Sequence, residues 1–378
     1  MDLLRKIGGF FRSETVLCVA AACAAISMCF VPPDGEYLAY LDFRVLCLLF
    51  CLMAIVAGLQ ECNLFWVVAN RLLAGKMNLR ALMLTLVLLP FFTSMFVTND
   101  VALIAFVPFA ILVLKLTRRE RLLAWIVALQ TVAANLGSMA TPVGNPQNLF
   151  IFAKYAPDAG SFFALVLPVT LVSLAAVGAA ALVSDRGTAE VVFEQKAHLR
   201  APKHLFMFLA LFALSLLAVF RAVHYLVPTA AAALYCLLFS RKTLAKVDYC
   251  LLMTFVFFFV FSGNIARISA VRDLLTGALE ADALLTSAAA SQIVSNVPAA
   301  VLLSGFTQNW RALLLGADIG GLGTPVASLA SLISLKLYAR AEGAQTGKYL
   351  RLFTALNAAL LALLLPLGYL VLKLIGDR

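Results

Sequence analysis

Two short polar stretches interrupt long apolar segments of the sequence. Both join an Asn to Ser or Thr, residue types whose carbonyl and hydroxyl oxygens suit a small hard cation. A helix that restarts at such a break also points backbone amides and positive partial charge at an anion. We therefore expect Thr98, Asn99, Ser295 and Asn296 to bind an anionic substrate. The same four residues and Asp100 are expected to offer ligands to Na⁺.

Helix capping is a simpler explanation of each stretch taken alone. Asn and Asp are good N-caps, and Pro298 suits the first turn of a following helix. Capping does not explain why residues 94–102 (SMFVTNDVA) match residues 291–299 (SQIVSNVPA) without a gap. We therefore favour a role as both cap and ligand.

A second pair of matched stretches follows the first, at 134–143 (ANLGSMATPV) and 317–326 (ADIGGLGTPV). Proline and glycine prevent a continuous helix there, and unwound backbone exposes carbonyls to a cation and amides to an anion. A simple proline kink is the alternative, which the duplication disfavours. We expect substrate contacts from Thr141, Pro142, Gly144, Asn145, Thr324 and Pro325. We expect coupling-ion contacts from Asn135, Asn148 and Ser328.

Each matched half keeps one acid, but on a different element. Asp100 stands opposite Val297, whereas Asn135 stands opposite Asp318. A carboxylate within a membrane is costly and is a functional candidate by default. Asp100 and Asp318 are expected to bind Na⁺ or to carry a proton, although Asp318 could instead pair with Arg311.

The elements that position these residues are apolar helices. Of 378 residues, 63% are hydrophobic and 13% charged, too few charges for a water-soluble surface. We predict an all-α polytopic membrane protein with about nine full spans and two re-entrant hairpins, the hairpins covering 80–116 and 283–307. The predicted spans are 14–32, 41–60, 121–153, 160–184, 204–220, 224–240, 247–264, 309–337 and 350–373.

The matched stretches occur in the same order in both halves, which predicts two repeats. The first repeat covers 1–184, with a broken helix at 121–153, and the second covers 222–378, with a broken helix at 309–337. Residues 185–221 form a solvated linker and one extra helix. An odd number of spans separates corresponding elements, so the second repeat is predicted to be inverted, as in secondary transporters.

The basic residues predict the orientation. Most of the 29 Lys and Arg residues fall on the side of the N-terminal segment, which itself contains Arg5, Lys6 and Arg12. By the positive-inside rule the N-terminus is cytoplasmic and the C-terminus outside, in the cytoplasmic (inner) membrane. No basic stretch lies on a soluble domain, so the partners are the bilayer and a small anion, with no nucleic acid. We also expect a homodimer, no metal cluster and no cofactor beyond the coupling ion.

These motifs resemble the ion transporter superfamily, in the branch with a citrate-transporter-like domain. That branch includes divalent anion:sodium symporters, arsenite efflux permeases and NhaD-type sodium/proton antiporters, and small bacterial members are called anion transporters. The resemblance covers about 15–370. The motifs that carry it are TNDVA at 98–102, GNPQNL at 144–149, SNVP at 295–298 and GTP at 323–325.

The resemblance implies an elevator mechanism in which paired Ser-Asn-Thr motifs at the hairpin tips bind substrate carboxylates and help to form two sodium sites. Thr98 and Asn99 match the first two motif positions, as do Ser295 and Asn296, but Asp100 and Val297 replace the third. A carboxylate at a tip repels a dianion unless it is protonated or neutralised by a cation.

The leading hypothesis is a secondary transporter of a small organic carboxylate or inorganic oxyanion, coupled to Na⁺ or H⁺. A Na⁺/H⁺ antiporter is the alternative, and an arsenite efflux permease is the third. A passive channel and an intramembrane aspartyl protease are further readings. We predict no enzymatic activity, because neither the Tyr-Asp nor the Gly-x-Gly-Asp signature of such proteases accompanies the two acids.

Overall fold

The computed structural model describes residues 14–183, 187–193 and 197–376. Two four-residue strands are the only described elements that are not helical. Arg5, Lys6 and Arg12, on which the predicted orientation partly rests, lie outside the described residues. The elements of the first half are α2 Thr15–Phe30, α3 Tyr37–Tyr40, α4 Phe43–Glu61, α5 Leu64–Leu73, β1 Gly75–Asn78, α6 Leu79–Ser94, α7 Asn99–Leu116, η1 Glu120–Leu122, α8 Leu123–Ser138, α9 Pro146–Tyr155 and α10 Ala159–Leu182.

The second half repeats much of this order of elements. A long helix bends at Asp282, where φ is −162° and ψ is 96°, so its first part is a connector and its second part enters the hairpin. The remaining elements are β2 Thr188–Val191, α11 Pro202–Val219, α12 Leu226–Phe239, α13 Arg241–Leu244, α14 Tyr249–Arg267, α15 Ser269–Val294, α16 Asn296–Leu303, α17 Trp310–Gly320, α18 Leu329–Ala339 and α19 Thr346–Leu374.

The helices agree with the predicted apolar segments, and a polytopic all-α membrane protein is confirmed. Six described helices are long and apolar enough to cross a membrane: α4, α7, α10, α11, α14 and α19. Both predicted hairpins contain a break, and both predicted broken spans consist of two shorter helices. The number of crossings and the inversion of the repeats remain predictions.

Equivalent aspartates begin the corresponding helices α4 and α14. The Asp42 carboxylate accepts a hydrogen bond from the Val45 amide at 3.0 Å, and the Asp248 carboxylate accepts one from the Leu251 amide at 2.8 Å. Each caps an otherwise unpaired amide in the first turn of its helix. The repeated aspartate is therefore explained by helix initiation.

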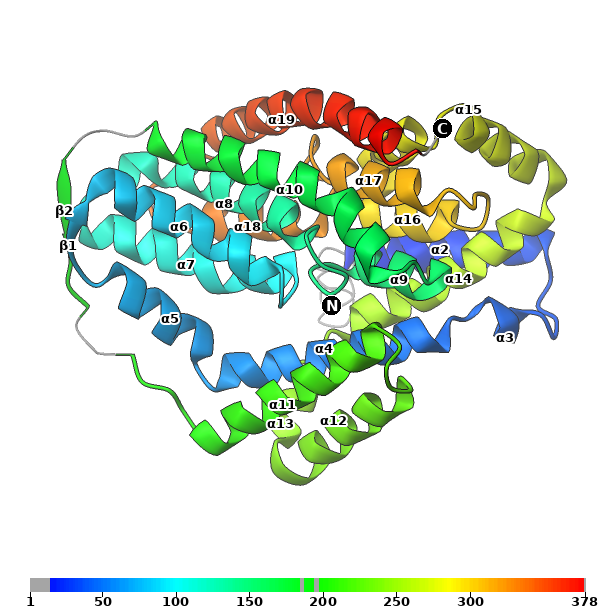
Figure 1. The fold of residues 1–378 in the computed structure, drawn as a ribbon, viewed down its shortest axis with the longest axis horizontal. Coiled ribbons are helices and arrows are strands. Elements are labelled where there is room, and N and C mark those ends of the chain that lie inside the picture. The colour runs from blue at the N-terminus through cyan, green and yellow to red at the C-terminus, as the bar shows by residue number, and fades with distance from the viewer. Residues whose placement is uncertain (1–13, 184–186, 194–196, 377–378) are drawn as a thin grey trace, which may run out of the picture.

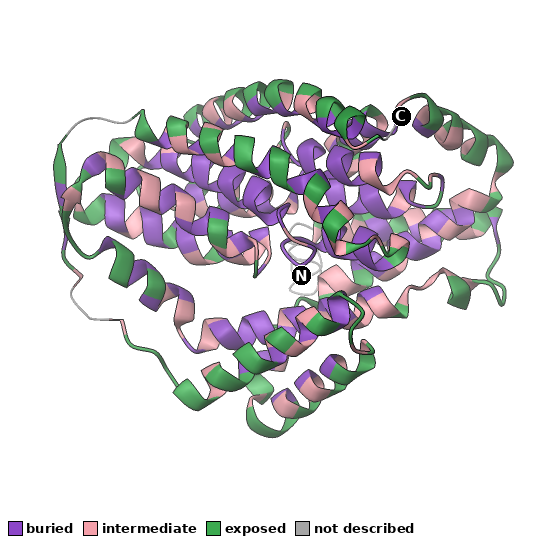
Figure 2. Ribbon diagram, in the orientation of Figure 1, coloured by how far each residue is buried: buried purple, intermediate pink, exposed green. Residues whose placement is uncertain are grey.

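The hairpins and the broken spans form one packed body. α6 and α7 pack against α8, and α15 and α16 pack against α17, with α10 and α19 covering them. In Figure 1 this body fills the upper part of the view, whereas α4, α11, α12 and α13 form a separate layer below it. Figure 2 shows that the hairpins and broken spans are mostly buried, whereas α11, α12 and α19 carry exposed outer faces.

The polar connection between the halves is more structured than we expected. Thr188–Val191 pairs antiparallel with Gly75–Asn78, the segment directly before α6, with Gly75 opposite Val191. Local propensity did not indicate these strands, because the stabilising partner lies far away in the sequence. The pairing ties the connection between the halves to the base of the first hairpin.

Candidate functional site

The two hairpin tips share an unusual backbone conformation. Thr98 has φ 57° and ψ 146°, and Ser295 has φ 74° and ψ 153°. A side chain other than glycine is strained in this region by about 1–3 kcal/mol and persists there only when its surroundings impose it. In each tip the strained residue directly precedes the Asn that begins the second half-helix. The same strain at two matched positions points to a functional turn.

Both tip asparagines are the first residues of their helices, bind the next backbone amide and also face a shared space. The Asn99 side-chain oxygen accepts from the Asp100 amide at 3.1 Å, and that of Asn296 accepts from the Val297 amide at 3.0 Å. Both residues are buried, and both line one small cavity of about 10 Å³, together with Gln147 and Ser328. A volume of this size holds about one water molecule. The structure therefore brings together the two predicted tips.

Asn135 joins the first hairpin to both broken spans. Its side-chain oxygen accepts from the Asn99 amide nitrogen at 2.9 Å and from the Ser328 hydroxyl at 3.1 Å. Its own amide nitrogen donates to the Ser331 hydroxyl at 3.4 Å. All four side chains are buried. Asn135 therefore fixes the position of the first tip relative to the start of α18.

Asp318 occupies the corresponding place in the second half, with different chemistry. One carboxylate oxygen accepts from the Asn145 amide at 3.2 Å and from the Gln147 amide at 3.1 Å. The other oxygen is buried and has no hydrogen-bond partner among the described residues, as is true of the Gln147 and Asn148 side-chain oxygens. A buried carboxylate held by neutral amides is costly while ionised. This arrangement can accept a proton or a cation.

The first unwound segment is held open by its own side chains. The Asn145 oxygen caps α9 through the Asn148 amide at 2.8 Å, and Asn148 in turn donates to the Met139 and Thr141 carbonyls at 3.1 and 3.2 Å. The Thr141 hydroxyl donates to the Met95 carbonyl at 2.5 Å, just before the first tip. These contacts connect the unwound backbone to the hairpin.

Gly144 allows the unwound backbone to fold tightly. A Cβ at this position would lie 2.0 Å from the Ser138 carbonyl oxygen. The neighbouring Pro142 is also buried. No larger residue fits at Gly144 without moving the segment that carries Asn145.

The second unwound segment is held by Gln292, from the first half of the second hairpin. Its amide nitrogen donates to the Gly320 and Leu322 carbonyls at 2.7 and 2.8 Å, and its oxygen accepts from the Thr324 amide at 3.0 Å. Thr324 itself is exposed and Pro325 half-buried, so these two predicted substrate ligands lie apart from the small cavity between the tips. Ser295 instead contacts the Ala327 carbonyl, at 3.4 Å.

A larger cavity of about 390 Å³ adjoins the first tip and contains Asp100. Thr98, Asp100 and Asn145 line this cavity, together with Lys246 and Asp248. One Asp100 carboxylate oxygen is buried without a hydrogen-bond partner in the described part of the chain. We call this space the tip cavity. The Lys246 side chain is 55% exposed, so the lining of the tip cavity includes a residue at the surface.

Sequence reasoning missed two glutamines that shape the site. Gln147 binds Asp318, and Gln292 binds the second unwound segment. Both stand within the stretches that marked the candidate site, so their position was a usable signal. Their partners come from distant elements, which the sequence pattern does not reveal.

The chain is similar to known transporters. Residues 6–309 match the model of a family described as citrate transporter. An uncharacterized transporter of Methanocaldococcus jannaschii is 30% identical over 299 residues, covering 78% of this chain and 81% of that protein. Inner membrane protein YbiR of Escherichia coli is 28% identical, covering 82% and 83%. A silicon efflux transporter of Oryza sativa is 33% identical over 146 residues, covering 38% of this chain and 29% of that protein.

Proposed function

Because the chain belongs to the citrate transporter family, and is therefore a transporter and not an enzyme, we propose that it couples a small anion to Na⁺ or H⁺. The substrate class is an organic carboxylate or an inorganic oxyanion. One observation carries this proposal: Asn99 and Asn296, at the starts of α7 and α16, line the same cavity as the half-buried Asp100, and Gln147 of that lining binds the buried Asp318. This cavity holds about one water molecule, so an anion in the adjoining larger cavity, which Asp100 also lines, would approach these two helix N-termini and carboxamides from there.

Coupling follows from the charges of the site. Asp100 and Asp318 would each repel an anion while they are ionised. A proton or Na⁺ at either carboxylate removes that repulsion, so the cation raises the affinity for the anion. By linkage the anion raises the affinity for the cation by the same factor. The unpartnered oxygens of Asp100 and Asp318 supply acceptors for this cation.

We further propose the cytoplasmic membrane and an elevator movement. With the orientation predicted from the charges, Lys246 is on the cytoplasmic side, and its place in the lining of the tip cavity supports an inward-facing state. The body formed by the hairpins and broken spans would move past the layer of α4, α11 and α12. The E. coli relative, named as an inner membrane protein, supports the proposed location.

A Na⁺/H⁺ antiporter is the second candidate, and the lining of the tip cavity favours it. Three acids, Glu14, Asp100 and Asp248, line this cavity. Lys246, the single cation among the described residues of this lining, is 2.9 Å from the Glu61 carboxylate and is therefore already paired. Such a lining attracts cations.

Two measurements test the proposal. The first is a thermal-shift screen of citrate, other carboxylates, phosphate, arsenite and silicic acid, with and without Na⁺ at two pH values. We expect an anion that stabilises the protein more strongly when Na⁺ or a lower pH is supplied. The second is current recording on supported membranes. Sodium–proton exchange in the absence of any added anion would contradict the anion proposal in favour of the antiporter.

A further inference from the structure

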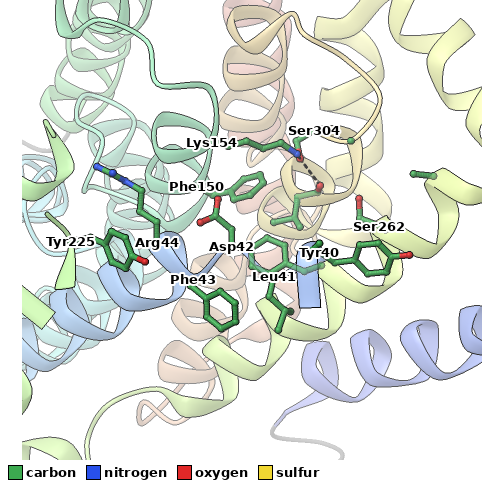
Figure 3. Close-up of a pocket in the computed structure, with 16 residues that line it drawn as sticks. Tyr40, Leu41, Asp42, Phe43, Arg44, Phe150, Lys154, Tyr225, Ser262 and Ser304 are labelled. Atoms are coloured by element: carbon green, nitrogen blue, oxygen red, sulfur yellow. Dashed lines mark hydrogen bonds between the residues drawn. The ribbon is translucent and has the colours of Figure 1, made fainter. Parts of the chain in front are cut away.

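A second and larger cavity, of about 590 Å³, lies between the α4 layer and the body that carries the hairpins. Figure 3 shows Arg44 of α4 and Lys154 of α9 in its lining, with Tyr225 and Ser304. We call this space the basic cavity. It contains no residue of either hairpin tip.

The cationic side chains in the basic cavity have only neutral hydrogen-bond partners. The Lys154 ammonium donates to the Ser304 hydroxyl at 2.8 Å, and the Arg44 guanidinium donates to the Ala218 carbonyl at 2.8 Å. Neither has a carboxylate within ion-pairing distance in the described chain. Asp42 is the one acid in the lining, and one of its oxygens already caps α4 through the Val45 amide.

A third cation strengthens the positive potential. Arg221, which follows α11, donates to the Ala153 carbonyl at 2.8 Å, one residue before Lys154. With Arg221 next to the cavity, three cations lie in or beside a lining whose one acid, among the described residues, is Asp42. A concave wall with excess positive charge raises the local concentration of anions.

α9 separates the basic cavity from the tip cavity. Pro146 and Leu149 line the tip cavity, whereas Phe150 and Lys154 line the basic cavity. The Phe150 ring lies 5.8 Å from the Phe259 ring, centroid to centroid, and so fills the space between α9 and α14. The two cavities therefore both border α9 but share no lining residue.

We propose that the basic cavity is an external anion-binding site of the transporter, with Lys154 and Arg44 as its ligands. The inference rests on the proposed function and on the orientation predicted from the charges, which places Arg44 and Lys154 outside. The ligand is a polyatomic anion, a carboxylate or an oxyanion. Such an anion replaces the neutral partners of the two cations with charge-assisted hydrogen bonds.

Transport kinetics give the first test. We expect Lys154→Gln and Arg44→Gln each to raise the KM for the external anion about tenfold, because each removes one of the charges that concentrate anions. We expect Lys154→Arg to keep a KM near that of the wild type. Arg272→Gln is the matched control, because Arg272 is exposed on the same predicted side beside Asp273 and is absent from the lining. An unchanged KM in both cavity variants, with transport intact, overturns this site and leaves the transport function standing.

Chemical labelling gives a test that does not depend on transport. Intact cells are treated with a membrane-impermeant amine reagent, and mass spectrometry follows the exposed side chains of Lys154, Lys373 and Lys348. We expect Lys154 and Lys373 to react, and cytoplasmic Lys348 to be protected. Citrate, sulfate or phosphate should slow labelling of Lys154 at least about threefold at constant ionic strength, and Arg44→Gln should remove this protection. Lys154 that does not react from outside, or no protection by any of the three anions, overturns the proposal.

Discussion

Replacing Asn99 by Ala tests the proposed anion site at the hairpin tips with little damage to the fold. The Asn99 side chain makes two hydrogen bonds, one to Asn135 at 2.9 Å and one from the Asp100 amide at 3.1 Å. We expect the variant to insert and fold but to lose transport at substrate concentrations near the wild-type KM.

The loss of folding stability and the loss of affinity for the anion differ in size. Each lost neutral hydrogen bond costs about 0.5–1.5 kcal/mol, and the Asn135 oxygen keeps the Ser328 hydroxyl at 3.1 Å, so no acceptor is left unpaired. The total loss is about 1–3 kcal/mol, below the roughly 5–15 kcal/mol that stabilises a typical domain. A hydrogen bond to a charged ligand contributes about 1.5–3 kcal/mol, so affinity for the anion should fall about ten- to a hundredfold.

Counterflow in proteoliposomes measures the transport, and a thermal melt measures the stability. Asn264→Ala is a matched control, because the buried Asn264 amide also makes two hydrogen bonds, to Ser27 at 2.9 Å and Tyr37 at 2.8 Å, away from the tips. It should lose similar stability and keep transport. Asn296→Ala should behave like Asn99→Ala. Wild-type flux in both tip variants would refute the binding site.

Three further changes probe the coupling and the unwound segments. Asp100→Asn should alter the Na⁺ or pH dependence of transport, because an amide cannot be protonated or neutralise a cation, and an unchanged dependence would remove Asp100 from the mechanism. Asp318→Asn should leave the melting temperature without added cation nearly unchanged or raised, because it removes a buried charge. It should also reduce the stabilisation that Na⁺ or acid provides in a thermal melt, and full retention of that stabilisation would contradict a cation site at Asp318. Gln292→Ala should destabilise the protein by about 2–4 kcal/mol through three lost hydrogen bonds and abolish counterflow, and an unchanged melting curve would count against its role in holding Gly320, Leu322 and Thr324.

The positions of the helix breaks could be predicted because their causes are local. Pro142, Gly144 and Pro146 end a helix in any surroundings, and the matched stretches then locate the second break. The aspartates that begin α4 and α14 also act within one turn. These features depend on neighbours in the sequence.

The contacts between elements could not be predicted in the same way. Thr141 and Thr324 occupy matched positions, and each hydroxyl donates to the carbonyl of a matched hairpin residue, Met95 at 2.5 Å and Gln292 at 3.4 Å. Thr141 is nevertheless half-buried, whereas Thr324 is exposed, and the sequence does not reveal this difference in burial. Asp318 illustrates this further, because its partners Asn145 and Gln147 come from the other half of the chain.

The central claim is that neutralising Asp100 and Asp318 couples the transport of an anion to that of a cation. The most direct measurement is uptake of the anion identified by the thermal-shift screen into proteoliposomes, under an imposed Na⁺ or proton gradient. We predict accumulation above equilibrium that disappears when the cation gradient is dissipated. Cation exchange that proceeds at the same rate with and without the anion, and no accumulation of the anion, would contradict the account.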